Sequence, residues 1–363
     1  MRCIRILVNM TDPAGPTRPA PGKITSFDVA RRAGVSQPTV SRALRNLPGT
    51  SPATRERVVR AALELAYVPS DRGRALSTRT TRRVAVVSEE LTNPYYPELI
   101  ELLRRELGAH DYGLVLVADA QSGEIRPDAL ADGSYDGVVL TTTRRRSALP
   151  RDLTERGVPH VLANRFLDHP ESPGCGMDNE AGSQAVADLL SGLGHSRIGA
   201  VHGPVDTSTG RERALGLQVG MLRHGLHVRR ELNRRTAFSH DAGRAAAAEL
   251  LSLPEPPTAL VCGNDVIALG ALSAAREAGV RVPEDLTVIG FDDIPMAGWP
   301  LVALTTMRCD LAAMARIAVE LLLDGIACGT EGELKVHRLV PTLVKRGTHG
   351  PPRRGPLASP AMS

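Results

Sequence analysis

The sequence predicts a small all-α head followed by a larger α/β core of two lobes. Between residues 24 and 67, apolar residues recur three times at helical spacing. From residue 84 onward, short apolar runs alternate with amphipathic helical stretches, which is typical of parallel sheets covered by helices on both faces. The stretch 84–347 is longer than one such unit normally needs, so we expect two lobes there.

Composition excludes several classes of protein. The five cysteines are widely spaced and form no C-x-x-C pair, which argues against a disulfide framework or a structural zinc site. No apolar run approaches the roughly 18 residues that a membrane-spanning helix needs. The first ten residues hold too short an apolar stretch for a secretory signal. We therefore expect a reduced, cytoplasmic protein with no metal, no cofactor and no membrane partner.

Charge is distributed unevenly along the chain. Residues 1–83 carry sixteen Lys and Arg against five Asp and Glu, a formal charge of +11. Because the whole chain carries +4, the rest of it carries −7. A basic segment joined to an acidic body indicates that the small part contacts a polyanion. A basic surface that is merely solvated is the alternative, and charge alone does not decide between the two.

Prolines, glycines and charge runs divide the chain into five segments. The proline-rich start and the PPRRGP end show little apolar periodicity and are predicted to be disordered. The segments are a leader at 1–22, a helical domain at 23–68, a hinge and linker at 69–83, the two-lobed core at 84–347 and a tail at 348–363.

The helical domain carries explicit helix boundaries. Thr25 can cap the first helix, and Gly34 fits the left-handed residue that ends it. Ser36 can cap a second helix, with Pro38 in its first turn, where a missing N–H costs nothing. Two short helices joined by a tight turn form a helix-turn-helix.

The second helix presents residues suited to reading DNA. Val40 and Leu44 face inward, so the outward candidates are Gln37, Thr39, Ser41, Arg42 and Arg45. Gln and Arg are the side chains that reach adenine and guanine edges in the major groove. In a third helix, Arg57 can contact phosphates. A helical hairpin that only packs is the alternative, but caps, turn glycine and exposed Arg and Gln coincide here and favour DNA binding.

These segments resemble the LacI/GalR family of bacterial transcription regulators. The head matches over DVARRAGVSQPTVSRAL, SPATRERVVRAALELAYVPS and RGRAL. The core continues the likeness with NPYYPELI, YDGVVL, GHSRIGAVHGP, PTALVCGND, RVPEDLTVIGFDD and LTTMRCD. The resemblance implies a helix-turn-helix head, a hinge helix and a core like that of periplasmic sugar-binding proteins. It also implies a homodimeric repressor controlled by a small effector. Because one short recognition helix covers too few base pairs alone, we expect the dimer to bind a pseudo-palindromic operator.

The resemblance extends the predicted DNA-binding set. It assigns base reading to Gln37, Pro38 and Arg42, and it matches Leu76 in the hinge to a leucine that wedges into the minor groove. Gly73 replaces a more common Ala there and should make the hinge helix order less readily. The full set is Thr25, Ser36, Gln37, Pro38, Thr39, Ser41, Arg42, Arg45, Arg57, Arg74 and Leu76.

A ligand pocket is expected outside the carboxyl ends of the core strands. Polar residues follow several predicted strands, among them Asn164, Asn264 and Asp292. The resemblance implies effector contacts at Tyr95, Tyr96, Asn164, Arg165, Thr207, Thr209, Arg213, Phe238, Asn264 and Asp292. Arg and Asp can bond neighbouring hydroxyls, while an aromatic face covers a ring, which suits a sugar or nucleoside. For Tyr96, Thr207 and Asn264, a role in a cap or turn is an equal alternative.

Two other functions are alternatives to DNA binding. The chain lacks G-x-G-x-x-G at its first βα unit, a phosphate-binding G-x-x-x-x-G-K-[ST] loop and a G-x-S-x-G elbow, so we expect no enzyme activity. A transport-type binding protein would have a similar core, but the basic head argues against it. The sequence leaves open which effector binds, whether it induces or corepresses, and whether the protein is a dimer or a tetramer.

Overall fold

The computed structural model describes residues 24–44, 46–67, 80–118, 125–329, 334–353 and 355. The chain divides into a helical unit that ends at Thr81 and an α/β unit that begins at Arg82, and each is described by itself. Of the expected DNA-binding residues, Arg45, Arg74 and Leu76 lie outside the described residues. The predicted leader and the part of the predicted hinge up to residue 79 also lie outside the described residues.

The helical unit contains α1 (Ser26–Ala33), α2 (Gln37–Leu44) and α3 (Pro52–Glu64). Gly34 ends α1 with φ 65° and ψ 40°, a left-handed conformation that glycine adopts without steric cost. Ser51 caps α3, because its Oγ accepts a hydrogen bond from the backbone N of Thr54 at 3.2 Å. The three helices pack around a small apolar core of Val29, Ala30, Val40, Ala43, Val58, Ala61 and Ala62.

The first lobe of the α/β unit is built on a parallel sheet. Its strands are β1 (Arg83–Val87), β2 (Gly113–Val117), β3 (Gly137–Leu140), β4 (His160–Ala163), β5 (Gly174–Met177) and β11 (Val336–Leu339). In the described part of the chain they form a six-stranded sheet in the order β11-β5-β4-β3-β1-β2. The lobe also contains α5 (Tyr95–Ala109), α6 (Leu149–Glu155) and α11 (Leu311–Cys328). β3 and β4 are buried along their whole length, as expected when helices cover both faces of a parallel sheet.

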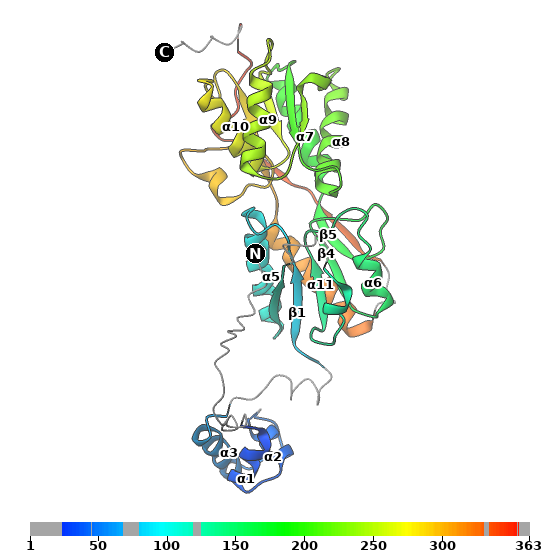
Figure 1. Cartoon of the computed structure of the whole chain (residues 1–363), viewed down its shortest axis with the longest axis vertical. Coiled ribbons are helices and arrows are strands. Elements are labelled where there is room, and N and C mark those ends of the chain that lie inside the picture. Colours follow the sequence, from blue (N-terminus) through cyan, green and yellow to red (C-terminus); the bar gives the residue numbers. More distant parts are fainter. Residues whose placement is uncertain are drawn as a thin grey trace, which may run out of the picture. The chain divides into compact units, whose positions relative to one another are not determined.

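The second lobe repeats this design with a smaller sheet. Its strands are β6 (Ile198–His202), β7 (Asn233–Arg235), β8 (Ala259–Cys262) and β9 (Thr287–Ile289). They pair in parallel in the order β7-β6-β8-β9. The covering helices are α7 (Asn179–Gly192), α8 (Ser208–Arg223), α9 (His240–Leu251) and α10 (Asp265–Glu277). α7 packs against α8, and α9 packs against α10 (Figure 1).

Several connections link the two lobes. The chain passes from β5 to α7, returns to α11, and leaves the first lobe again after β11. On the side of the second lobe, β10 (Thr306–Arg308) and β12 (Thr342–Val344) form an antiparallel pair at these crossings. Short 3-10 helices lie in the loops at η1 (Pro127–Ala129), η2 (Arg230–Leu232) and η3 (Pro295–Gly298). The carboxyl ends of the strands and the crossings therefore meet between the lobes.

The prediction of a disordered tail from residue 348 is wrong for residues 348–353. Thr348 is buried, and its Oγ1 donates to the carbonyl oxygen of Val288 at 2.7 Å. The Arg353 guanidinium donates to the carbonyl oxygens of Pro257 and Asp285, each at 2.9 Å. These partners are far away in sequence, so composition alone could not reveal that this segment packs beside β9.

The described residues also bear on membrane and metal binding. No helix among them is long and apolar enough to cross a membrane. Within the same residues, no group of three or more His, Cys, Asp or Glu is arranged to hold a metal ion.

Candidate functional site

The exposed face of the helical unit holds most of the described residues expected to contact DNA. On α2, Pro38 and Arg42 are exposed, while Gln37, Thr39 and Ser41 are half-buried. The Gln37 amide donates to the Ser26 hydroxyl at 3.3 Å, which ties the start of α2 to α1. α2 therefore presents one cation and several polar groups on its outer face, next to a buried apolar face.

Helix caps account for two of the other predicted residues. The Thr25 backbone N and hydroxyl both donate to a carboxylate oxygen of Asp28, at 2.9 and 2.7 Å. These bonds, with Arg31 nearby, lower the pKa of Asp28. The Ser36 and Thr39 hydroxyls bond each other at 2.8 Å at the start of α2. Arg57 is exposed on α3, where it is available to a phosphate.

In the α/β unit, nine of the ten residues expected to contact an effector line one small cavity between the lobes. The cavity has a volume of about 10 Å³, because the side chains around it bond to one another. From the first lobe come Tyr95, Tyr96, Asn164 and Arg165, and from the second come Thr209, Arg213, Phe238, Asn264 and Asp292. Asn93, which the sequence analysis did not identify, completes the lining.

Of the described residues that were expected there, Thr207 alone is not part of the lining. Its hydroxyl accepts from the backbone N of Gly210 at 3.1 Å and donates to the carbonyl oxygen of Pro204 at 2.9 Å. Thr207 is thus the N-cap of α8, which is the alternative role weighed for it. Asn264 has two roles. Its side-chain oxygen caps α10 by accepting a hydrogen bond from the backbone N of Ile267 at 3.0 Å, and the residue also lines the cavity.

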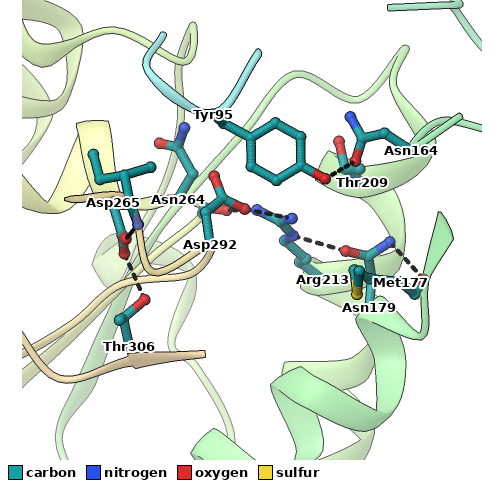
Figure 2. Close-up of polar contacts among 12 residues, drawn as sticks. Tyr95, Asn164, Met177, Asn179, Thr209, Arg213, Asn264, Asp265, Asp292 and Thr306 are labelled. Atoms are coloured by element: carbon teal, nitrogen blue, oxygen red, sulfur yellow. Dashed lines mark hydrogen bonds and ion pairs between the residues drawn. The ribbon is translucent and has the colours of Figure 1, made fainter. Parts of the chain in front are cut away.

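A buried ion pair forms the polar centre of the cavity. One Nη of Arg213 donates to Oδ1 of Asp292 at 2.9 Å, and the two side chains are 6% and 5% exposed (Figure 2). The same guanidinium donates to Oδ1 of Asn179 and to the carbonyl oxygen of Gly263, at 2.9 and 2.7 Å. Its carbon lies 3.7 Å from the ring centre of Phe291. Burial raises the pKa of Asp292 to about 6, although Arg213 acts in the opposite direction.

Two lining residues have strained backbones. Asn164 has φ 80° and Asp292 has φ 123°, in a region that L-residues rarely adopt. Residues held in this way concentrate at binding and catalytic sites, because the surroundings must supply the energy that the strain costs. For Asp292 the support includes its backbone N, which donates to the carbonyl oxygen of Met307 in β10 at 2.8 Å.

The opposite wall of the cavity is aromatic. The rings of Tyr95 and Tyr96 meet edge to face, with centres 5.3 Å apart. The Tyr95 hydroxyl donates to Oδ1 of Asn164 at 2.9 Å (Figure 2). The amide of Asn164 donates to the Tyr96 hydroxyl at 3.3 Å. The Arg165 guanidinium lies between the rings of Tyr96 and Phe238, 5.7 and 5.8 Å from their centres. Apolar ring faces therefore stand opposite the Arg213–Asp292 pair.

The two lobes also contact each other beside the cavity. The backbone N of Phe166 donates to the Ser208 hydroxyl at 3.0 Å. Arg145 donates to the carbonyl oxygen of Val205 at 2.8 Å. A molecule held in the cavity would therefore contact both lobes, and its binding would depend on their relative position.

Models of two known families match the chain. The model for bacterial regulatory proteins of the lacI family matches residues 27–70, and the model for a periplasmic binding protein-like domain matches residues 187–349. The predicted fold class, a helix-turn-helix head followed by a two-lobed α/β core, is confirmed by these matches and by the solved structures below.

Similar proteins of known name are regulators of transcription. The repressor CytR of Escherichia coli K12 is 37% identical over 308 residues, which cover 83% of this chain and 89% of CytR. The regulator CelR of Thermobifida fusca is 36% identical over 308 residues, which cover 82% of this chain and 90% of CelR.

Solved structures resemble this one over most of the chain. A complex of the transcriptional regulator CelR with cellobiose has a TM-score of 0.69 and 32% identity, and the match covers 90% of this chain and 99% of that one. The lac repressor dimer bound to operator and the anti-inducer ONPF has a TM-score of 0.80 and 25% identity, covering 90% and 98%.

Proposed function

The chain belongs to the lacI family of bacterial regulatory proteins, and we propose that it is a repressor whose affinity for operator DNA is controlled by a small polar effector. As a member of this family it is a DNA-binding regulator of transcription, not an enzyme. The observation that carries the proposal is the convergence of nine predicted residues on one cavity between the lobes. A ligand bound at such a site contacts both lobes and can change their relative position.

The chemistry of the cavity supports a sugar or a nucleoside as the effector. The Arg213–Asp292 pair offers donors and an acceptor to neighbouring hydroxyls. The rings of Tyr96 and Phe238 offer apolar faces to a sugar or base ring. CelR, a relative with 32% identity, has been solved with cellobiose bound, which supports the sugar alternative.

On the DNA side, we propose that α2 enters the major groove. Gln37, Pro38 and Arg42 would face base edges, with Arg57 of α3 on the phosphates. The exposed position of Arg42 on α2 supports this assignment. Thr25, Ser36, Thr39 and Ser41 border the same face, where their hydroxyls and the helix starts can meet phosphate oxygens.

We propose that the protein acts as a homodimer in the cytoplasm, where bacterial DNA lies. The loop after η3 exposes Leu301 fully and Trp299 by more than half, and apolar side chains this exposed favour burial against a partner. A dimer also fits a pseudo-palindromic operator, because one short recognition helix covers too few base pairs alone. The lac repressor structure that resembles this chain is likewise a dimer on its operator.

The test combines ligand screening with DNA binding. Disaccharides and nucleosides, cellobiose and adenosine among them, are screened for a rise in the melting temperature of the full-length protein. Any compound that stabilises it is then titrated into the complex with promoter DNA. Asp292→Asn and Phe238→Ala should abolish the response to that compound and preserve DNA binding without it. Arg223→Ala, on the exposed face of α8, is the matched control and should respond like wild type.

Unchanged titrations in both cavity variants would contradict the placement of the effector site. Failure of the purified protein to retard any promoter fragment, with or without the compounds, would contradict the proposed repressor function itself.

A further inference from the structure

We propose that Asp265 is a positioning residue that holds Asp292 in the effector cavity and links it to β10, the strand that leads to the other lobe. The inference rests on the proposed function, since it takes Asp292 to be an effector contact. Asp265 is the first residue of α10 and is completely buried. It does not line the cavity, so it acts through Asp292.

Two hydrogen bonds from Asp265 bracket Asp292 in the chain. The backbone N of Asp265 donates to the carbonyl oxygen of Phe291 at 2.8 Å. Its Oδ2 accepts from the backbone N of Ile294 at 2.9 Å. A single residue therefore holds the backbone on both sides of Asp292.

A third bond connects Asp265 to β10. Its Oδ1 accepts from the Thr306 hydroxyl at 2.5 Å (Figure 2). β10 also contacts Asp292 itself, because the carbonyl oxygen of Met307 accepts from the backbone N of Asp292 at 2.8 Å. Beyond β10 the chain enters α11 of the first lobe. The cavity and this connection between the lobes thus share one hydrogen-bond network.

The loop needs such support because its backbone is strained. Asp292 and the next residue, Asp293, have φ of 123° and 59°. Conformations of this kind persist only where the surroundings hold them. The Asp265 carboxylate also packs against the chain just before Asp292: a Cβ added to Gly290 would lie 2.1 Å from its Oδ1. Glycine at position 290 thus allows the carboxylate to approach the loop closely.

Electrostatics link Asp265 to the cavity as well. Burial raises the pKa of Asp265 to about 7, and the nearby charge of Asp292 acts in the same direction. Among the described residues, Asp293, Cys262 at the end of β8 and Cys309 after β10 also interact with this carboxyl. As the pH rises through about 7, Asp265 gains a charge that repels the charge of Asp292 in the same buried site.

The decisive variant is Thr306→Val, which removes the hydroxyl and keeps the shape of the side chain. Thr305→Val is its matched control. Both threonines are completely buried, but the Thr305 hydroxyl interacts with His349 and with the backbone N of Arg346 instead of Asp265. Amide hydrogen exchange is measured on the full-length proteins without any ligand.

In Thr306→Val, the amides of Asp292 and Ile294 should exchange faster than in wild type, whereas Thr305→Val should leave them unchanged. Equal exchange of these amides in all three proteins would overturn the proposal. Because this measurement needs no effector, its outcome is independent of the proposed function. A changed exchange pattern together with a failure of every sugar and nucleoside to bind wild type would count against the proposed function alone.

Effector titration is a second test of the proposed role of Asp265. With whichever of cellobiose or adenosine stabilises wild type, Thr306→Val should bind it about ten-fold more weakly, equivalent to about 1.4 kcal/mol. Thr305→Val should bind it like wild type.

The pH profile tests the electrostatic link. Asp265→Asn retains the shape of the side chain and removes its titration. Wild-type affinity should fall between about pH 6.5 and about pH 8.5. Asp265→Asn should lack that fall, and an identical pH profile in both proteins would overturn the electrostatic link.

Discussion

Replacing Arg213 with Met should destabilise the α/β core by about 3–5 kcal/mol, because it leaves a buried carboxylate without its counter-ion. Arg213 and Asp292 are 2.9 Å apart, and their side chains are 6% and 5% exposed. Met has an apolar stem similar to that of Arg, so most of the loss should come from charge and lost hydrogen bonds and not from an empty volume.

The pH dependence of this loss identifies its cause. Burial raises the pKa of Asp292 from 3.8 to about 6 in the folded protein. The folded state therefore holds this proton more tightly than the unfolded chain does, so stability falls as the pH rises from about 4 to about 6, by roughly 3 kcal/mol. Without Arg213 the pKa rises further. The loss caused by Arg213→Met should thus be larger at about pH 8 than at about pH 5, where the carboxyl is largely protonated.

Urea unfolding of the full-length protein, followed by circular dichroism at both pH values, measures the effect. The double variant Arg213→Met/Asp292→Asn should recover much of the loss, because the carboxylate that lost its counter-ion is then replaced by a neutral amide. Arg223→Met, on the exposed face of α8, is the control and should change stability by less than about 0.5 kcal/mol. An equal loss at both pH values, with no recovery in the double variant, would refute the electrostatic account. The cost would then lie in the bonds from Arg213 to Asn179 and Gly263.

Three further predictions concern DNA binding, assembly and the head. Arg42→Ala should weaken operator binding by about 1–3 kcal/mol and relax specificity at one symmetric base pair, whereas Arg57→Ala should weaken binding to all sequences evenly, as competition gel shifts would reveal. Leu301→Arg should shift the protein toward monomer in sedimentation, and an unchanged dimer would exclude the exposed Trp299–Leu301 loop as the interface. Ser51→Ala should cost the head about 1 kcal/mol, read as faster amide exchange in α3, because the cap is lost.

Local signals explain why the head was predictable from sequence. The glycine that ends α1 and the serine that caps α3 act on residues within one turn of themselves. Alternating apolar runs likewise predicted most strands of both sheets, because a strand covered on both faces must be apolar throughout. β5, with the sequence GCGM, carries no such run, because two of its four residues are glycines with no apolar side chain.

The segment 348–353 could not be predicted because its partners are distant. Pro, Arg and Gly are common both in ordered segments that pack on a protein surface and in disordered tails. Composition therefore does not distinguish the two. The difference is made by Thr348 on Val288 and by Arg353 on Pro257 and Asp285. These bonds satisfy backbone carbonyls of the second lobe, a requirement that appears only once its sheet has formed.

The effector cavity shows a similar division between local and tertiary information. Sequence patterns indicate where the strands end, and polar residues at those ends are obvious candidates. Whether such a residue caps a helix or faces the cavity depends on backbone direction: Thr207 only caps α8, whereas Asn264 caps α10 and also lines the cavity. Asp265, adjacent to Asn264, points away toward β10. Three polar residues near helix starts thus take three different roles. Only the folded arrangement of these loops could assign those roles.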